Sequence, residues 1–155
     1  MDLKQNLILT VVMFIGEYQH TLDDKGRLAV PAKFRNDLDK GIVITRELDH
    51  CLSLYPIDEW ERRATELSKI KTAHSDPRSF VRSQLSGAMD LKLDSQGRAI
   101  IPDYLRAYAG VKKDVVVVGL YNHLEIWDAE MWKKYRANFE QLGDEIAERM
   151  GEVGI

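Results

Sequence analysis

The chain contains the same thirteen-residue unit twice, and this repeat limits the possible folds more than any other feature. The first copy occupies residues 23–35 and the second residues 94–106. Asp, Gly, Arg, Pro and a closing Arg stand at the same places in both copies, and an aliphatic residue precedes each Pro. A repeated unit of this kind indicates two similar modules, so the architecture has to be a doubled one.

Each unit predicts a turn, a short strand and a short helix. Asp followed three residues later by Gly favours a turn, since Asp accepts hydrogen bonds from the turn amides and Gly tolerates positive φ. In the first copy, strand alternation puts Arg27 and Leu28 on opposite faces. Pro31 ends that strand and suits the start of a helix over residues 32–37. Pro102 plays the same part in the second copy.

The similarity extends beyond the motif to most of each half. Each half continues with an apolar strand, a turn, a second apolar strand and a helix. The paired positions are Gly16 with Gly87, Leu22 with Leu93, Leu52 with Leu124, Leu54 with Ile126, Tyr55 with Trp127 and Trp60 with Trp132. A module of four short strands and one or two helices is too small to bury much core alone. We therefore expect an α+β, mainly β, fold in which the two modules pack against one another.

Helices are expected between and after the modules. An amphipathic stripe begins at Ile57, Asp76 and Pro77 form a helix start, and Asp128 can cap a last helix that runs to Ile146. The acidic end beyond Gly143 is expected to be solvated or partly disordered. The expected segments are an N-terminal extension (1–12), two repeats (17–59 and 88–131), a helical connector (60–87) and a C-terminal helix with an acidic tail (132–155).

The doubled unit, with residues 14–18 and 52–56, resembles the MraZ family of tandem SpoVT/AbrB-type regulators. The resemblance runs from about Met13 to about Phe139. It implies two pseudo-symmetric, swapped-hairpin AbrB-like half-barrels, assembled into a homo-oligomeric ring. It also implies a cytoplasmic, nucleoid-associated regulator that binds double-stranded DNA at direct repeats in the promoter of its own division and cell-wall operon, usually as a repressor. Members begin near Met13, so we expect residues 1–12 to precede the natural start, with an extra edge strand as the alternative.

The resemblance assigns DNA recognition to Arg27 and Arg98, since the family signature Asp-x-x-x-Arg falls on these arginines and their preceding aspartates. Guanidinium groups can take the O6 and N7 atoms of guanine as bidentate donors. Lys25 is placed for a phosphate, and its counterpart Gln96 for a phosphate or an adenine. The expected orienting and turn residues are Asp23, Gly26, Asp94 and Gly97. Lys33, Arg35 and Arg106 are expected to be structural or interface groups first and phosphate contacts second.

The formal net charge of −3 hides a separation of charge along the chain. Residues 23–35 hold four Lys and Arg against two Asp, whereas the stretch from residue 140 onward holds five acidic residues against one Arg. Each subunit offers few cations to neutralise phosphates, so a single copy is expected to bind nonspecific DNA weakly. Several copies on one ring can combine weak contacts through effective concentration, which suits repeated short boxes.

Three other interpretations remain open from the residues. Arg27 and Arg98 can serve only as surface partners of their aspartates. The repeat can bring Asp23 and Asp94 together as a proton-sharing dyad of a hydrolase, although an adjacent Arg works against a shared proton. The ring itself can be the function, with incidental DNA binding.

The expected function is not enzymatic, and neither a cofactor nor a small-molecule substrate is expected. The single cysteine, Cys51, stands beside His50 in a turn without a second pair of ligands, so no metal site is expected. No stretch approaches membrane-spanning length, and no membrane partner is expected.

Overall fold

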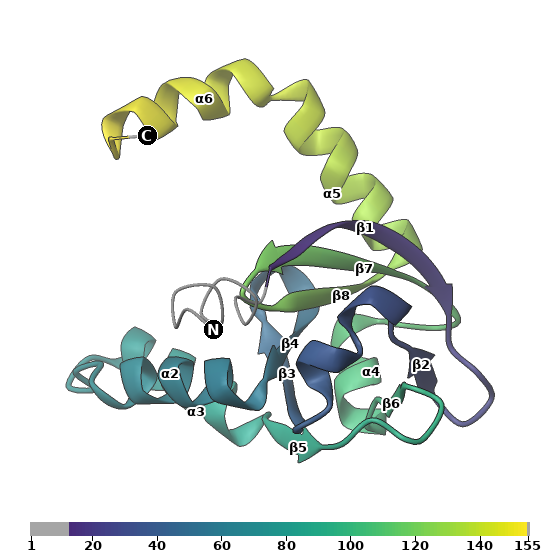
Figure 1. Ribbon diagram of the computed structural model, residues 1–155. Coiled ribbons are helices and arrows are strands. Elements are labelled where there is room, and N and C mark those ends of the chain that lie inside the picture. Colours follow the sequence, from purple (N-terminus) through teal and green to yellow (C-terminus); the bar gives the residue numbers. More distant parts are fainter. Residues whose placement is uncertain (1–12, 155) are drawn as a thin grey trace, which may run out of the picture.

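Four strands form in each half, as the repeat predicts (Figure 1). The computed structural model describes residues 13–154, and the expectations for residues 1–12 lie outside them. The first half contains β1 (Phe14–Thr21), β2 (Arg27–Ala29), β3 (Ile42–Glu47) and β4 (Cys51–Pro56). The second half contains β5 (Met89–Leu91), β6 (Arg98–Ile100), β7 (Asp114–Tyr121) and β8 (Leu124–Asp128).

The two halves exchange strands. β1 pairs antiparallel with β7 along its whole length, from Phe14 opposite Tyr121 to Thr21 opposite Asp114. In the reciprocal place, β5 pairs with β3, and β2 pairs with β6 in a separate two-stranded ribbon. The larger sheet has the order β1-β7-β8-β4-β3-β5. This swapped arrangement confirms the α+β, mainly β, fold of two similar modules.

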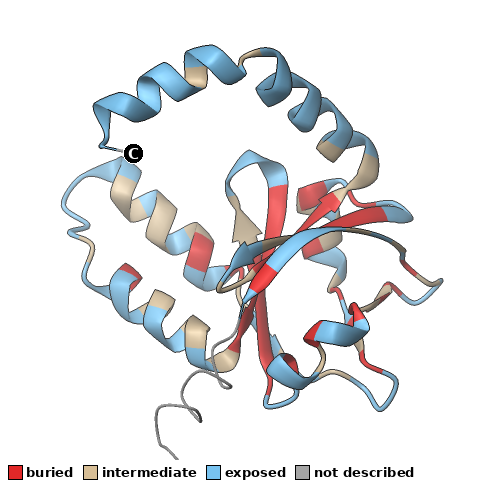
Figure 2. Ribbon diagram, turned by 45° about the horizontal axis from the view of Figure 1, so that its top comes forward, coloured by how far each residue is buried: buried red, intermediate tan, exposed pale blue. Residues whose placement is uncertain are grey.

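The apolar runs of the sequence occupy the middle of the sheet. All six residues of β4 are buried between β3 and β8. Val115 and Val117 of β7 face one hydrophobic cluster, and Val116 and Val118 face another. Such a β-branched run fits a strand that is covered on both faces. The main cluster combines side chains of both halves, so the modules share one core. Figure 2 shows that the buried residues, in red, are concentrated in the sheet and the segments around it.

Five helices and three short 3₁₀ turns complete the described residues. The helices are α2 (Ile57–Ser68), α3 (Ser75–Ser86), α4 (Asp103–Ala109), α5 (Ala129–Gln141) and α6 (Gly143–Glu152). The 3₁₀ turns are η1 (Ala32–Phe34), η2 (Asn36–Leu38) and η3 (Leu48–His50). Asp128 caps α5 by accepting a hydrogen bond from the Met131 N–H at 3.3 Å, as predicted.

Three expectations about helices were wrong. Residues 32–37 do not form one helix but belong to η1 and η2, because Asn36 and Asp37 favour hydrogen bonds outside a helix. α3 begins two residues early, with His74 at the N-cap position and Asp76 within the first turn. The expected single C-terminal helix is interrupted at Leu142, between α5 and α6.

The acidic end beyond Gly143 is helical and contains no buried residue, so the solvated alternative of the expectation holds and the disordered one does not. α6 carries Asp144 and Glu145 in its first turn and Arg149 in its last, which suits the helix dipole. Glu145 and Arg149 also form an ion pair at 3.5 Å, four residues apart. This charge order stabilises the helix although none of its residues is buried.

The helices that end the two halves are held differently. The end of α3 is joined to β3, where the Thr45 hydroxyl donates to the Gln84 carbonyl at 2.6 Å and the Gln84 amide donates to the Arg46 carbonyl at 2.7 Å. α5 and α6 instead leave the sheet as a bent arm, seen in yellow-green and yellow at the top of Figure 1. The two-fold similarity of the chain therefore holds in the strands and ends in the arm.

Candidate nucleic-acid interface

The β2–β6 ribbon places both signature arginines on one surface. Leu28 lies opposite Ala99 in the register, and both are buried against the core. Side chains alternate between the faces of a strand, so the neighbours of these two residues point outward. The outward face of the ribbon consists of Arg27, Ala29, Arg98 and Ile100.

The turn before β2 is built around the carboxylate of Asp23. One of its oxygens accepts hydrogen bonds from the backbone N–H groups of Lys25 and Arg27, each at 2.9 Å. The Gly26 N–H donates to the Asp23 carbonyl at 2.9 Å, and Gly26 has a φ of 76°. The predicted turn is therefore present, with the positive φ that favours Gly.

The turn before β6 repeats this arrangement. Asp94 accepts from the N–H groups of Gln96 and Arg98, each at 2.9 Å, and Gly97 has a φ of 74°. The match of partners and distances in the two turns shows that the sequence repeat specifies one local structure twice.

Each aspartate also holds the side chain of its arginine. Arg27 Nε donates to the second oxygen of Asp23 at 2.6 Å, and Arg98 Nε donates to that of Asp94 at 2.8 Å. The side chains are about one-quarter exposed, at 28% for Arg27 and 26% for Arg98. A charge-assisted bond of this kind limits the rotamers of a long side chain, and because it is made through Nε it does not use the terminal N–H groups.

The two carboxylates are held in the charged state. Hydrogen bonds from the backbone N–H groups of Arg27 and Arg98 are the main cause that lowers the pKa of Asp23 and of Asp94, respectively. The arginine side chains act in the same direction. A proton-sharing dyad requires one raised pKa, so this geometry favours an orienting role over acid–base chemistry.

The halves are also joined across the ribbon. The Val30 N–H donates to the Gly97 carbonyl at 3.0 Å, and the Ile101 N–H donates to the Gly26 carbonyl at 2.9 Å. Asp23 additionally lies 3.9 Å from a terminal nitrogen of Arg98, the arginine of the other half. The two turns are therefore set in a fixed relation, and the pair of arginines acts as one rigid surface.

The closing arginine of each unit packs against the turn of the other half. Arg35 Nε donates to the Val30 carbonyl and Arg106 Nε to the Ile101 carbonyl, each at 3.0 Å. Their side chains lie so close to Gly97 and Gly26, respectively, that a Cβ there would collide with them. The turn glycines are thus required for space as well as for φ.

The remaining predicted site residues lie around the ribbon. Lys25 and Gln96 are exposed at the tips of the two turns. Lys33 is exposed on η1, with its ammonium 4.8 Å from the centre of the Tyr18 ring. Arg106 also forms an ion pair with Asp103. The structure therefore brings Lys25, Gln96 and the paired arginines to one surface, while Arg35 and Arg106 make structural contacts.

Two contributions to this surface were not predicted from the sequence. One is the support of each turn by the closing arginine of the other half. The sequence signal for it was the equal spacing from Pro31 to Arg35 and from Pro102 to Arg106. The other is the exposed Ile100, whose neighbour across the ribbon depends on the pairing of two distant strands.

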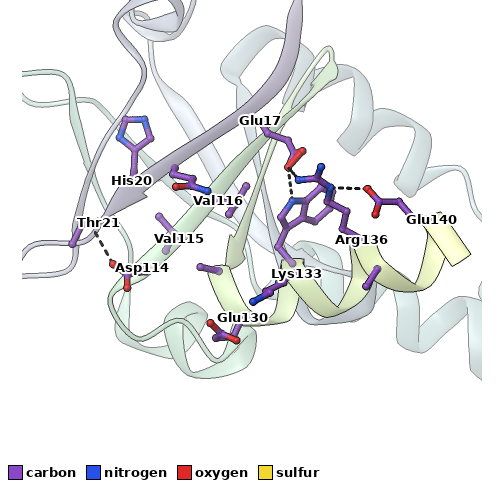
Figure 3. Close-up of a pocket in the computed structure, with 14 residues that line it drawn as sticks. Glu17, His20, Thr21, Asp114, Val115, Val116, Glu130, Lys133, Arg136 and Glu140 are labelled. Carbon is purple, nitrogen blue, oxygen red and sulfur yellow. Dashed lines mark hydrogen bonds and ion pairs between the residues drawn. The ribbon is translucent and has the colours of Figure 1, made fainter.

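A cleft of about 930 Å³ lies elsewhere, between β1 and α5 (Figure 3). Glu17 on its wall accepts a hydrogen bond from Trp132 Nε1 at 2.7 Å and pairs with Arg136 at 3.4 Å. Arg136 also bonds to Glu140 at 3.0 Å. These contacts attach α5 to the edge strand, so the paired charges have a structural role.

Neither a metal-binding cluster nor a membrane-spanning helix occurs in the described part of the chain. Within residues 13–154, no three His, Cys, Asp or Glu side chains gather in a way that could hold a metal ion. None of the helices in this range combines the length and the apolar character needed to cross a bilayer.

Comparison with known proteins assigns the chain to a family. The model of the MraZ protein family matches it twice, at residues 13–83 and 84–153. A protein of Syntrophomonas wolfei is 46% identical over 143 residues, and one of Clostridium beijerinckii is 48% identical over 143 residues. Each alignment covers 92% of this chain and 100% of the relative, and both relatives are named transcriptional regulator MraZ. The chain therefore belongs to the MraZ family of transcriptional regulators.

Proposed function

We propose that the chain binds double-stranded DNA sequence-specifically through the outward face of the β2–β6 ribbon. The observation that carries this proposal is the pair of arginines, each bonded through Nε to a carboxylate of its own turn. A two-stranded ribbon fits the major groove of B-DNA, and a guanidinium group with free terminal N–H groups can bond to O6 and N7 of guanine. Arg27 and Arg98 are the proposed base-reading residues.

The surrounding residues have the supporting roles. Lys25 at one turn tip is a phosphate contact, and Gln96 at the other contacts a phosphate or an adenine edge. Asp23 and Asp94 orient the arginines. Arg35 and Arg106 act mainly through the turns that they support.

We further propose that several copies form a ring and bind direct repeats in the promoter of the chain's own operon, as a repressor. The α5–α6 arm supports self-association, since it exposes Met131, Tyr135, Phe139, Met150 and Val153. An exposed row of apolar side chains on two helices is typical of a contact surface. Linked subunits add the weak contacts of single ribbons, which suits repeated boxes and a role at the nucleoid.

The direct test is a fluorescence-anisotropy titration with a duplex from upstream of the chain's own gene and a scrambled duplex of equal composition. We expect a preference for the upstream duplex that persists when the salt concentration is raised, because base contacts depend less on counterion release than phosphate contacts do. Equal binding that disappears at higher salt would contradict sequence-specific recognition and would favour a protein whose assembly is its function.

A further inference from the structure

The outward face of the ribbon contains one large apolar side chain, Ile100. The other members of this face are two arginines and the small side chain of Ala29. Ile100 is 51% exposed, although isoleucine is among the residues most often buried. A single exposed apolar residue is common on protein surfaces, so its position relative to the arginines has to decide its meaning.

The strand register sets Ile100 beside Arg27. The two residues are direct partners in the antiparallel pairing, and Ala29 is the partner of Arg98 in the same way. Directly opposite residues have Cβ atoms about 4.5–5.5 Å apart and share one face of the ribbon. Each arginine is therefore accompanied by a side chain of the other half, a large one for Arg27 and a small one for Arg98.

Both arginines are held by the aspartates of their own turns, so the size of the cross-strand neighbour is what distinguishes the two positions. Arg27 is drawn toward its own turn by the 2.6 Å bond from Nε to Asp23. The Ile100 side chain is on the same outward face and has no bond that draws it toward a turn. If the ribbon enters the major groove as proposed, the register places Ile100 where its branched side chain can face the base pair next to the guanine of Arg27.

We propose that Ile100 contacts the C5 methyl group of a thymine adjacent to the guanine read by Arg27. The thymine methyl is the apolar group that the major groove displays, and apolar side chains recognise it. Ala29 is too short to make the same contact beside Arg98. The two arginines therefore differ in the sequence that they recognise. Arg27 requires a thymine next to its guanine, whereas Arg98 requires only the guanine. This inference rests on the proposed recognition of DNA by the ribbon.

The test removes the methyl group and the side chain separately. Each thymine of the upstream duplex is replaced in turn by deoxyuridine, which lacks the C5 methyl and keeps the same hydrogen-bonding groups. Wild-type protein is expected to bind at least one such duplex about fourfold more weakly, because this is the change in affinity that the burial of one methyl-sized group produces. Ile100→Ala is expected to bind the intact duplex more weakly by a similar factor and to show no further loss at that thymine.

Two further variants make the test specific. Ile15→Ala removes another exposed isoleucine, 56% exposed on β1 and outside the ribbon, and it should keep the methyl dependence of the wild type. Ala29→Ile places the large side chain beside Arg98 and should create a second methyl-dependent thymine. Light scattering of each variant checks that the assembly is unchanged.

The outcomes separate this inference from the proposed function. In one outcome the wild type prefers the upstream duplex, but its affinity does not depend on any thymine methyl, or this dependence is still present in Ile100→Ala. That result would overturn the proposed contact of Ile100 and would leave the proposed role of the arginines unaffected. A change in particle mass on Ile100→Ala would assign the side chain to a subunit contact and would also overturn it. Equal binding to upstream and scrambled duplexes would contradict the proposed function itself, and the inference with it.

Discussion

Arg27 and Arg98 differ from ordinary surface arginines because each is fixed by a carboxylate four residues earlier in the chain. That carboxylate also holds two backbone N–H groups of its turn, so the turn and the side chain are ordered together. A preorganised donor loses less conformational entropy when it binds, which strengthens each contact with a base. At the scale of residues, the proposed recognition of DNA therefore depends on the Asp–Arg pairs.

Replacing either arginine by alanine should weaken binding to the upstream duplex by about 1–3 kcal/mol per engaged site, or roughly 5- to 150-fold. Specificity should also relax at one base position. The measurement is anisotropy on the upstream duplex and on duplexes in which single guanines are replaced by 7-deazaguanine, which lacks N7. Arg62→Ala removes an exposed arginine on α2 and serves as the control. Unchanged affinity of Arg27→Ala would remove that residue from the proposed site.

The lowered pKa of Asp23 and of Asp94 leads to a prediction about pH. A carboxylate with a depressed pKa in the folded state contributes stability above its unfolded pKa, and this contribution is lost as the pH falls through the folded pKa. Asp94→Asn should therefore be less stable than wild type at pH 7, and the difference in unfolding free energy should shrink below about pH 4. Denaturant titrations at several pH values measure it, with the exposed neighbour Asp24→Asn as control. A difference that stays constant down to acid pH would show that the charge of Asp94 has no part in the turn.

At the scale of elements, the ribbon and its two turns form one unit because each half supplies support to the other. The turn carbonyls accept hydrogen bonds from the opposite strand ends, and the closing arginines lie over the opposite glycines. A change in one turn should therefore affect both halves of the surface.

Gly97→Ala is expected to destabilise the protein by at least about 1–2 kcal/mol, since alanine is disfavoured at a φ of 74°. Its Cβ would also displace the Arg35 side chain. Gly143→Ala is the matched control, because Gly143 lies at the start of α6 with nothing within 4 Å of an added Cβ. The measurement is thermal unfolding. Equal melting temperatures for the two variants would show that the turn relaxes around the new side chain without cost.

At the scale of the whole molecule, the arm formed by α5 and α6 lies outside the main core, and only the start of α5 packs on the sheet, where Ala129 and Trp132 contact the second cluster. Neither helix contains a buried residue, whereas the main core cluster is built from the strands, η1, η2 and α4 with their connecting segments. The acidic end of the chain lies in this arm and not at the ribbon. The separation of charge in the sequence is thus also a separation in space.

Removal of residues 143–155 should leave the core stable and reduce the size of the assembly. We expect a melting temperature close to that of the full chain, a lower particle mass by light scattering, and a larger loss of affinity for repeated boxes than for a single box, because linked binding is what the arm supplies. A truncated chain that keeps its particle mass would place the subunit contact elsewhere.

The local structure of the turns and strand ends follows from short-range patterns in the sequence. Asp23, Gly26 and Pro31, with their counterparts in the second copy, encode turns and strand ends through hydrogen bonds and φ angles within a few residues, and such effects can be read from spacing. The same spacing placed both arginines on exposed strand faces. The ends of helices could not be predicted as well, as residues 32–37 and the acidic tail show. The helix propensities of these segments are weak, so contacts with neighbouring segments decide their conformation.

The order of the strands in the sheet depends instead on contacts between residues that are distant in the sequence. The exchange of β1 and β5 between the halves, the position of Arg35 over Gly97 and the pairing of Ile100 with Arg27 join residues that are far apart in the chain. Their physical cause is that neither module can bury its apolar strands alone, so the two close around one shared core. The sequence repeat predicts two similar halves, and the burial of their common core determines how the two halves form the surface of the β2–β6 ribbon.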